Sequence, residues 1–297
     1  MDRATWQHLL QLDKEFRRRD EIFSRNKIRE TMGCSTAQAR LYDWGLKHKD
    51  IIQLKVQSDT SFVGQKVFLI CDIHIPFHDQ VAVDAALNYA DEYKPDTIII
   101  NGDMLDFYKC SRFTKKTGKH NIKGELKMGR EFLADLRKRH PNAKMIFKEG
   151  NHESHLERYV LENAVEIADL VDDLLINKLD LNTLDIEYRK DFFSIGKLWY
   201  LHGHEKPAGG SQAEYITNCM FKYTLDHTIF GHFHRTQDKI FKRIDGSTIW
   251  VGACGYLGGP MEYAPLNNWN QGFATIDYGK NGTFRAHLHK IQDGEIY

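Results

Sequence analysis

Short apolar runs alternate with helical periodicity from residue 65 onward, and this alternation limits the possible folds more than any other feature. Residues 66–71 form a near-continuous apolar run, which is typical of a strand covered on both faces. Further helix and strand patterns follow at residues 80–93 (helix), 97–101 (strand), 125–139 (helix) and 144–148 (strand). Strand patterns then recur at residues 197–201, 227–230, 247–251, 273–277 and 283–289. The pattern predicts an α/β domain over residues 65–297, a layered β-sandwich flanked by helices.

Residues 1–60 have a different pattern and are predicted to form a separate, small helical domain. A first amphipathic helix is indicated by apolar residues at helical spacing, namely Trp6, Leu9, Leu10 and Leu12. Residues 22–31 have a second helical pattern, and Ser35 can cap a third helix that runs to about residue 47.

Residues 32–34, Met-Gly-Cys, would join the second and third helices by a short turn that contains glycine. Two helices joined in this way resemble the helix-turn-helix family of DNA-binding modules. Arg29 departs from that family, which usually has a small residue at this position. The segment is interpreted as either a DNA-binding module or a helical cap or dimerisation element.

Charge and cysteine content exclude several classes of protein. The 41 basic and 41 acidic residues balance, so no global field attracts a polyanion. The five cysteines are odd in number and include no CxxC pair, which is typical of reduced thiols in the cytosol. The N-terminus lacks the apolar core of a signal peptide, and no apolar run approaches the roughly 18 residues that span a bilayer. We therefore expect a cytoplasmic protein with no membrane partner.

Aspartate, asparagine and histidine residues follow the predicted strands at the point where each strand ends. Because loops at the carboxyl ends of strands converge on one crevice, we expect these side chains to meet there. A single histidine in such a place is usually only a hydrogen-bonded loop residue, but a full set in register does not arise by accident. The set comprises Asp72, His74, Asp103, Asn151, His152, His202, His232 and His234.

These residue types fit a metal site. Carboxylate oxygens and imidazole nitrogens suit borderline divalent ions such as Mn, Fe, Zn or Ni, and the set contains no thiolate. One carboxylate shared by two ions roughly 3.5–4 Å apart makes a clamp for the attacking and leaving oxygens of a phosphoryl group. The sequence therefore predicts two divalent metal ions, with Mn the foremost candidate.

The motifs DxH, GD, GNHE, H and GHxH, in this order over about residues 66–235, resemble the calcineurin-like metallophosphoesterase superfamily. The resemblance extends to about residue 290 and implies hydrolysis of a phosphate ester by a water held between the two metals. It implies that Asp103 bridges the ions. It further implies that the first ion is held by Asp72, His74 and His234, and the second by Asn151, His202 and His232.

His152 would then be a non-ligand histidine near the substrate, which protonates the leaving oxygen or stabilises charge on the phosphate. Asp106 is expected to orient a ligand or cap a turn, and Glu153 to pack at the start of a helix. The remaining nearby histidines, His78, His155 and His204, are interpreted as partners of ligands or as surface residues.

The substrate is a separate question. Ser/Thr phosphatases of the superfamily carry GDxVDRG, whose arginine grips the phosphate, but residues 102–108 read Gly-Asp-Met-Leu-Asp-Phe-Tyr and lack it. This departure argues against that branch. Residues 105–148 contain 13 Lys/Arg and 4 Asp/Glu, a local balance of +9. The densest part carries the predicted substrate-binding residues Lys109, Arg112, Lys115, Lys116 and Lys119.

Basic side chains beside the metals would hold a polyphosphate backbone, and Tyr108 or Phe113 could stack on an unpaired base. The leading hypothesis is a phosphodiesterase that acts on DNA, a nuclease similar to DNA-repair exonucleases. One alternative is a phosphatase or phosphodiesterase for a nucleotide or another small molecule, with the lysines only a solvated face. Another is a DNA-binding regulator with a vestigial metal site. Dimers are common in the superfamily, so a homodimer is one possible oligomeric state.

Overall fold

The computed structural model describes residues 64–110, 121–166, 171–205, 215–260 and 267–297, together with residues 8, 11–13, 16 and 24–32. By its contacts the chain divides into two compact units, Met1–Ser58 and Asp59–Tyr297.

In the first unit, helix α2 (Arg25–Met32) lies within the region of the predicted second helix. Its residue Ile28 is fully buried, and residues 8, 11–13 and 16 are also helical. Met32, predicted in the glycine turn, is instead the last residue of α2. The rest of the turn and the predicted third helix fall outside the described residues, and with them the helix-turn-helix prediction.

The second unit contains a seven-stranded sheet in the order β12-β11-β10-β1-β2-β3-β4. Strands β1 to β4 are parallel to one another, and β10 runs antiparallel to β1 on the other side. The strands are β1 (Lys66–Ile70), β2 (Thr97–Asn101), β3 (Lys144–Lys148), β4 (Ile186–Arg189), β10 (Gln271–Tyr278), β11 (Phe284–Gln292) and β12 (Glu295–Ile296).

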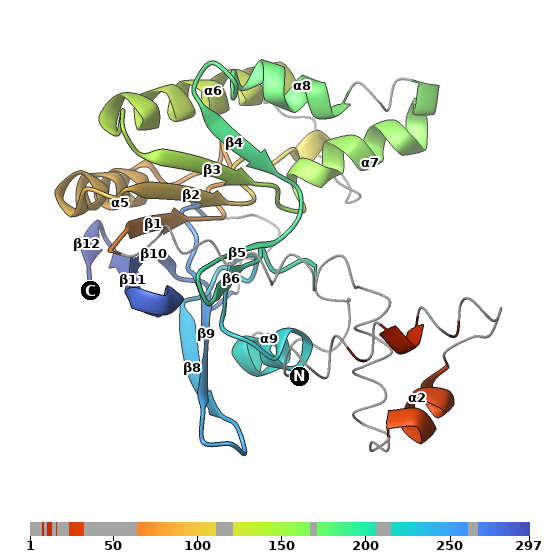
Figure 1. The fold of residues 1–297 in the computed structure, drawn as a ribbon. Helices are drawn as coiled ribbons and strands as arrows, with labels where there is room; N and C mark the ends of the chain where they lie inside the picture. Colours follow the sequence, from red (N-terminus) through yellow and green to blue (C-terminus); the bar gives the residue numbers. More distant parts are fainter. Residues whose placement is uncertain are drawn as a thin grey trace. The chain divides into compact units, whose positions relative to one another are not determined.

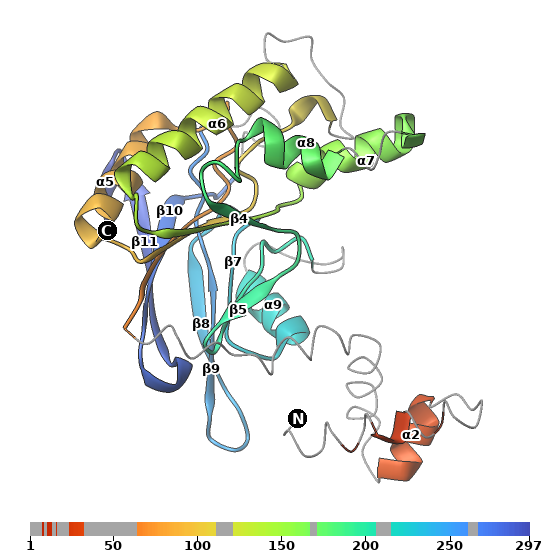
Figure 2. The ribbon, with the colours of Figure 1, turned by 45° about the horizontal axis from the view of Figure 1, so that its top comes forward.

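A five-stranded sheet has the order β5-β6-β7-β9-β8, in which β6, β7 and β9 are parallel. The strands are β5 (Phe193–Ile195), β6 (Leu198–Tyr200), β7 (Thr228–Phe230), β8 (Gln237–Lys242) and β9 (Thr248–Ala253). Strands β8 and β9 form a long antiparallel hairpin (Figure 2).

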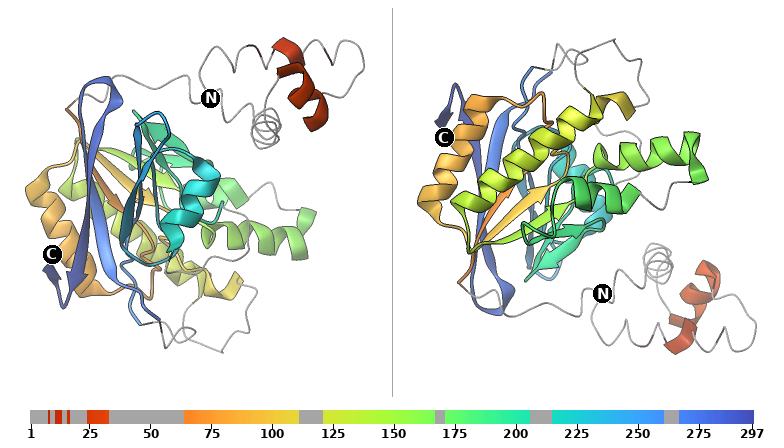
Figure 3. Two further views of the ribbon diagram at one scale, coloured as in Figure 1. Left: turned by 90° about the horizontal axis from the view of Figure 1, so that it is seen from below. Right: turned by 90° about the horizontal axis from the view of Figure 1, so that it is seen from above.

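Helices cover the outer faces of both sheets (Figures 1 and 3). Helices α5 and α6 lie on the seven-stranded sheet, and α9 packs on β8 and β9 from the opposite side. The helices are α5 (Gln80–Tyr93), α6 (Ile122–Arg139), α7 (Glu153–Asn163), α8 (Val171–Lys178) and α9 (Ile216–Thr224), with short 3₁₀ turns at η2 (Tyr108–Cys110) and η5 (Lys280–Gly282). The predicted layered α/β fold is confirmed.

Alternate residues of β1 enter two different cores, which explains the continuous apolar run of this strand. Phe68 and Ile70 pack in the core beneath α5 and α6, whereas Val67 and Leu69 pack in the core between the sheets. Strands β4, β5, β8 and β12 have no counterpart in the sequence prediction, because they are short or, in β8, exposed at four of six positions. Edge strands of this kind lack the apolar pattern that reveals a buried strand.

Candidate metal centre

All seven predicted ligands lie on loops at the carboxyl ends of five strands. The loops after β1, β2 and β3 belong to one sheet, and those after β6 and β7 belong to the other. Contacts join the side chains into one cluster of Asp72, His74, Asp103, Asn151, His202, His232 and His234. The two sheets therefore converge on a single polar site.

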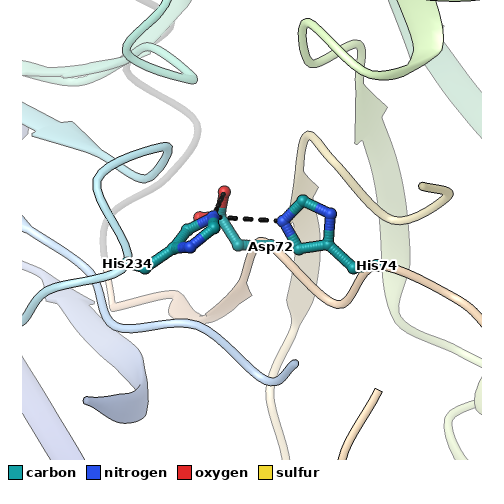
Figure 4. Close-up of side chains that lie close together, drawn as sticks. All are labelled: Asp72, His74 and His234. Carbon is teal, nitrogen blue, oxygen red and sulfur yellow. Dashed lines mark hydrogen bonds and ion pairs between the residues drawn. The ribbon is translucent and has the colours of Figure 1, made fainter. Parts of the chain in front are cut away.

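The first group in this cluster comprises Asp72, His74 and His234, whose nearest donor atoms all lie within 4.8 Å of one another. Nε2 of His74 lies 3.1 Å from Nε2 of His234, which in turn lies 3.3 Å from Oδ1 of Asp72. Figure 4 shows His234 on one loop approaching Asp72 and His74, which share the loop after β1. All three side chains are buried.

The second group comprises Asp103, His202 and His232, and its donor atoms meet the same limit. Nε2 of His202 lies 3.1 Å from Oδ2 of Asp103 and 3.2 Å from Oδ1 of Asn151. Asp103 also belongs to a group with His74 and His152, so its carboxylate lies between the two halves of the cluster. A ligand that bridges two ions needs this position.

Hydrogen bonds on the far side of two rings determine which nitrogen faces the cluster. Nδ1 of His202 lies 2.8 Å from the carbonyl oxygen of Asn101, and Nδ1 of His74 lies 3.0 Å from Oδ1 of Asp106. A carbonyl and an ionised carboxylate only accept, so both Nδ1 atoms carry a proton. In the neutral rings each Nε2 then presents its lone pair to the cluster, as metal-ligating histidines do.

The pKa shifts differ from residue to residue within the cluster: burial lowers the pKa of His232 to about 4 and also lowers that of His234. Burial would raise the pKa of Asp72, but the hydrogen bond and charge of His234 outweigh it and lower this pKa to about 2. Burial would lower the pKa of His202, but the charge of Asp103 outweighs it and raises this pKa to about 9. The oxygen and nitrogen donors fit borderline divalent ions, whose binding would release the imidazole protons.

Backbone strain concentrates at the cluster. Non-glycine residues in the left-handed region cost roughly 1–2 kcal/mol each and persist where the surroundings hold them. Backbone hydrogen bonds of 3.0 Å from Asp72 N to Gly102 O and from His74 N to Asp103 O supply such support. The strained residues of the cluster, with their φ, are Asp72 (53°), His74 (56°), Asp103 (51°), His232 (66°) and His234 (55°).

His152 lies at the edge of the cluster with 18% of its side chain exposed, whereas His74 and His202 are fully buried. Its Nδ1 donates to the carbonyl oxygen of Asp106 at 2.6 Å, and its Nε2 lies 3.9 Å from Oδ2 of Asp103. Burial would lower the pKa of His152, but the charge of Asp103 outweighs it and raises this pKa to about 10. Asp106 thus contacts both His74 and His152, in line with its expected orienting role.

Glu153 begins helix α7, as expected, and in addition holds the loop that carries Asp103. Its fully buried carboxylate accepts hydrogen bonds of 2.9 Å from the backbone nitrogens of Asp103, Leu105 and Gly150. Glu125 of α6 accepts a hydrogen bond from the backbone nitrogen of Phe107 in the same loop. Sequence reasoning missed Glu125, because a single acidic residue on an amphipathic helix is ordinarily exposed.

An aromatic wall borders the first group. The ring of Tyr256 stacks on His234 with centroids 5.0 Å apart and planes at 11°, and Trp269 packs edge-on at 4.3 Å. Leu257 N donates to the carbonyl oxygen of Asp72 at 3.0 Å. The segment that follows β9, residues 254–260, therefore contacts the site.

The three neighbouring histidines are half-buried, and two of them pack against rings of the cluster. The His155 ring is 4.7 Å from the His152 ring, and the His204 ring is 5.4 Å from that of His202. His78 lies 3.1 Å from the side-chain oxygen of Gln80 through Nε2.

The basic segment is described only in part. Lys109 lies in η2, directly after the loop that carries Asp103, whereas Arg112, Lys115, Lys116 and Lys119 fall outside the described residues. Several other basic side chains between residues 105 and 148 make hydrogen bonds or ion pairs within the fold. Arg137 donates to the carbonyl oxygens of Leu184, His140, Pro141, Ala143 and Asp185, and ion pairs are made by Arg139, Lys144 and Lys148. These four basic side chains are thus already engaged within the fold.

Within the described part of the chain, no helix has the length and apolar character needed to cross a membrane. The four cysteines described there, Cys71, Cys110, Cys219 and Cys254, are free thiols.

Two phage proteins are similar to this chain in sequence. The Gene 54 protein of Mycobacterium phage L5 is 26% identical over 234 residues, which cover 72% of this chain and 89% of the phage protein. The Gene 54 protein of Mycobacterium phage D29 is 26% identical over 239 residues, which cover 74% of this chain and 91% of that protein.

Solved structures that are similar to this chain include Vps29 from Entamoeba histolytica complexed with Zn²⁺. The likeness has 13% identity and a TM-score of 0.43, and it covers 78% of this chain and 96% of Vps29. Another is YfcE, a phosphoesterase from E. coli, at 12% identity and a TM-score of 0.32, covering 71% of this chain and 88% of YfcE. At these TM-scores, neither likeness bears on the metal or the substrate of this chain.

The sequence model of the calcineurin-like phosphoesterase family matches residues 65–290. This range includes all of the five-stranded sheet, the seven-stranded sheet up to β11, and all seven predicted ligands. The resemblance on which the ligand set rests is therefore confirmed. This chain belongs to the calcineurin-like phosphoesterase family.

Proposed function

We propose that this protein hydrolyses phosphodiester bonds in DNA with the help of two divalent metal ions. The observation that carries the proposal is the cluster in which the carboxylate of Asp103 lies between two groups of ligand atoms. The first ion would be held by Asp72, His74 and His234, the second by Asn151, His202 and His232, and both by Asp103. When bound, the ions would neutralise charge on the phosphate and lower the pKa of water.

His152 is the residue that we assign to proton transfer. Its Nδ1 proton is held by the carbonyl oxygen of Asp106, so Nε2 is the atom that can give a proton to the leaving oxygen. Against the effect of burial, the charge of Asp103 and the hydrogen bond to Asp106 raise the pKa of this ring. Partial exposure leaves it accessible to a substrate, unlike the buried rings of His74 and His202.

DNA as the substrate rests on the basic segment that follows the loop of Asp103. Lys109, and in the sequence Arg112, Lys115, Lys116 and Lys119, would neutralise backbone phosphates. The competing candidate is a nucleotide or another small phosphate ester. It is favoured by the contacts that already engage Arg137, Arg139 and Lys144, since these leave fewer cations for a long polyanion.

An activity screen tests the proposal. The full chain is incubated with Mn²⁺, Fe²⁺, Zn²⁺ or Ni²⁺ and with labelled single- and double-stranded DNA, RNA, a cyclic nucleotide, bis-p-nitrophenyl phosphate and p-nitrophenyl phosphate. We expect cleavage of DNA and of the bis ester, with Asp103→Asn as the inactive control. Turnover of the small esters without any cleavage of DNA would replace the DNA proposal by the small-molecule alternative.

The basic residues are tested separately by Lys115→Ala/Lys116→Ala/Lys119→Ala. DNA cleavage should fall and lose much of its salt dependence, because fewer counterions are released on binding. Hydrolysis of bis-p-nitrophenyl phosphate should not change. Metal analysis addresses the regulator alternative, which predicts fewer than one bound ion per chain after reconstitution.

A further inference from the structure

An ion pair between a buried lysine and a half-buried glutamate joins the two sheets beside the metal cluster. Lys148 is the last residue of β3 in the seven-stranded sheet, and its side chain is fully buried. Its Nζ lies 3.0 Å from Oε1 of Glu205, which stands on the loop after β6 of the five-stranded sheet. Neither residue belongs to the ligand set or to the proton-transfer group.

Glu205 fixes the backbone of a predicted ligand. Its two carboxylate oxygens accept hydrogen bonds from the backbone nitrogens of His202, at 3.0 Å, and Gly203, at 2.6 Å. Asn101 holds the same loop from β2, since its Nδ2 donates to the carbonyl oxygen of Leu201 at 2.7 Å. The carboxylate of Glu205 is thus occupied by Lys148 and by two backbone donors.

Lys148 fixes the other side. Its Nζ donates to the carbonyl oxygen of Glu149 at 2.6 Å, two residues before Asn151. The Glu149 carboxylate is itself held by the hydroxyl groups of Ser154, at 2.6 Å, and Tyr188. The ion pair therefore connects the loop that carries Asn151 with the loop that carries His202.

Placing a charged pair in this part of the protein has an energetic cost, which needs an explanation. Removing a charged group from water costs several kcal/mol, and buried ion pairs are often replaced by apolar residues without loss of stability. What a well-oriented pair provides is a defined distance between the two loops. Such fixed support matters most at a metal site, where ligands must be held within about 0.5 Å.

We propose that Lys148 and Glu205 are positioning residues that set the separation of Asn151 and His202, and thereby the affinity for the second metal ion. This inference rests on the metal assignment proposed above. Loss of the pair should weaken the second ion by about 10–100-fold, the usual effect of removing a group that supports a metal ligand. The first ion, held by Asp72, His74 and His234 on other loops, should keep its affinity.

Calorimetric titration of the metal-free protein with Mn²⁺ tests the proposal, together with electron paramagnetic resonance of the coupled Mn²⁺ pair. The variant Lys148→Met/Glu205→Gln removes both charges at nearly constant volume, so it leaves no unpaired buried charge. We expect one unchanged and one weakened binding event, and loss of the coupled signal at limiting metal. The matched control is Lys190→Met/Glu157→Gln, which removes an exposed pair of 3.3 Å and should alter neither event.

A second variant covers the case in which the double variant does not fold. Glu205→Asp keeps both charges but withdraws the carboxylate by one methylene group, and it should also weaken the second ion alone. If the wild type binds two ions and a folded variant binds both with unchanged affinities, this inference is overturned and the proposed function stays intact. A wild type that binds a single ion would overturn the metal assignment and this inference with it.

Discussion

Replacing Gly231 by alanine tests how closely the loop after β7 approaches the metal cluster. A Cβ atom at this position would lie 2.5 Å from Oδ2 of Asp72 and 2.8 Å from Sγ of Cys71. Ordinary contact begins at 3.4 Å, so Asp72 or the loop would have to move by about 0.9 Å. Neither neighbour has room to move, because both side chains are fully buried.

Two effects of Gly231→Ala follow from this distance. Overpacking of a buried site costs typically 1–3 kcal/mol of unfolding free energy. In a unit of this size that loss lowers Tm by about 2–12 °C. A displacement near 1 Å can also reduce kcat/KM by about 100-fold, because the reacting groups lose alignment. Gly231 has no positive φ, so the effect is steric rather than conformational.

The assay compares thermal unfolding, Mn²⁺ affinity and hydrolysis of bis-p-nitrophenyl phosphate between the wild type and the variant. Gly124→Ala is the matched control: its Cβ would meet only Oδ1 of Asn121, at 3.5 Å, on the first turn of α6. Alanine there should leave activity unchanged and raise stability by up to about 1 kcal/mol. Wild-type Mn²⁺ affinity and kcat/KM in Gly231→Ala would refute the packing argument.

Three further substitutions have defined outcomes. Asp103→Asn should abolish both metal binding and hydrolysis, since one carboxylate serves both halves of the cluster; elemental analysis that still finds two ions would contradict a bridging role. His152→Gln should lower kcat by roughly 10²–10⁴-fold while both ions stay bound, because only proton transfer is lost; loss of metal by calorimetry would point to a ligand instead. Glu125 is protonated at neutral pH, because burial raises its pKa to about 8. An acid whose pKa is raised in the folded state contributes stability that is fully present below its pKa in the unfolded chain, about 4.3. This contribution is lost as the pH rises through about 8. Glu125→Gln should therefore flatten the fall of Tm between pH 5 and 8, and an identical fall in both proteins would show that Glu125 does not titrate in this range.

The sequence predicts the parts of the fold that have strong apolar patterns. Strands β1, β2 and β3 are buried at four or five of their five positions, and each predicted range overlaps the observed strand. Strand β8 is exposed at four of its six positions and has no apolar pattern, and β12 has only two residues. Neither strand can therefore be recognised from the sequence. The motifs predict which side chains meet, because each one follows a strand whose carboxyl end lies at the shared edge.

What the sequence could not reveal is the support around the ligands. Glu125, Lys148 and Glu205 have ionisable side chains, and such side chains are ordinarily solvent-exposed. Their burial depends on partners far away in the chain: Glu125 meets Phe107, and Lys148 meets Glu205 across the two sheets. No local periodicity encodes such pairs.

The two-sheet architecture explains why these distant supports matter. The first group takes Asp72 and His74 from the seven-stranded sheet and His234 from the other, and the second group joins Asp103 to His202 in the same way. Each half of the cluster therefore depends on how one sheet is placed against its neighbour. The apolar core between the sheets sets their spacing, but the hydrophobic effect itself has no direction. Directional contacts join the sheets at the cluster itself: Asn101 donates to Leu201, and Lys148 pairs with Glu205. These contacts hold one sheet in position relative to the other.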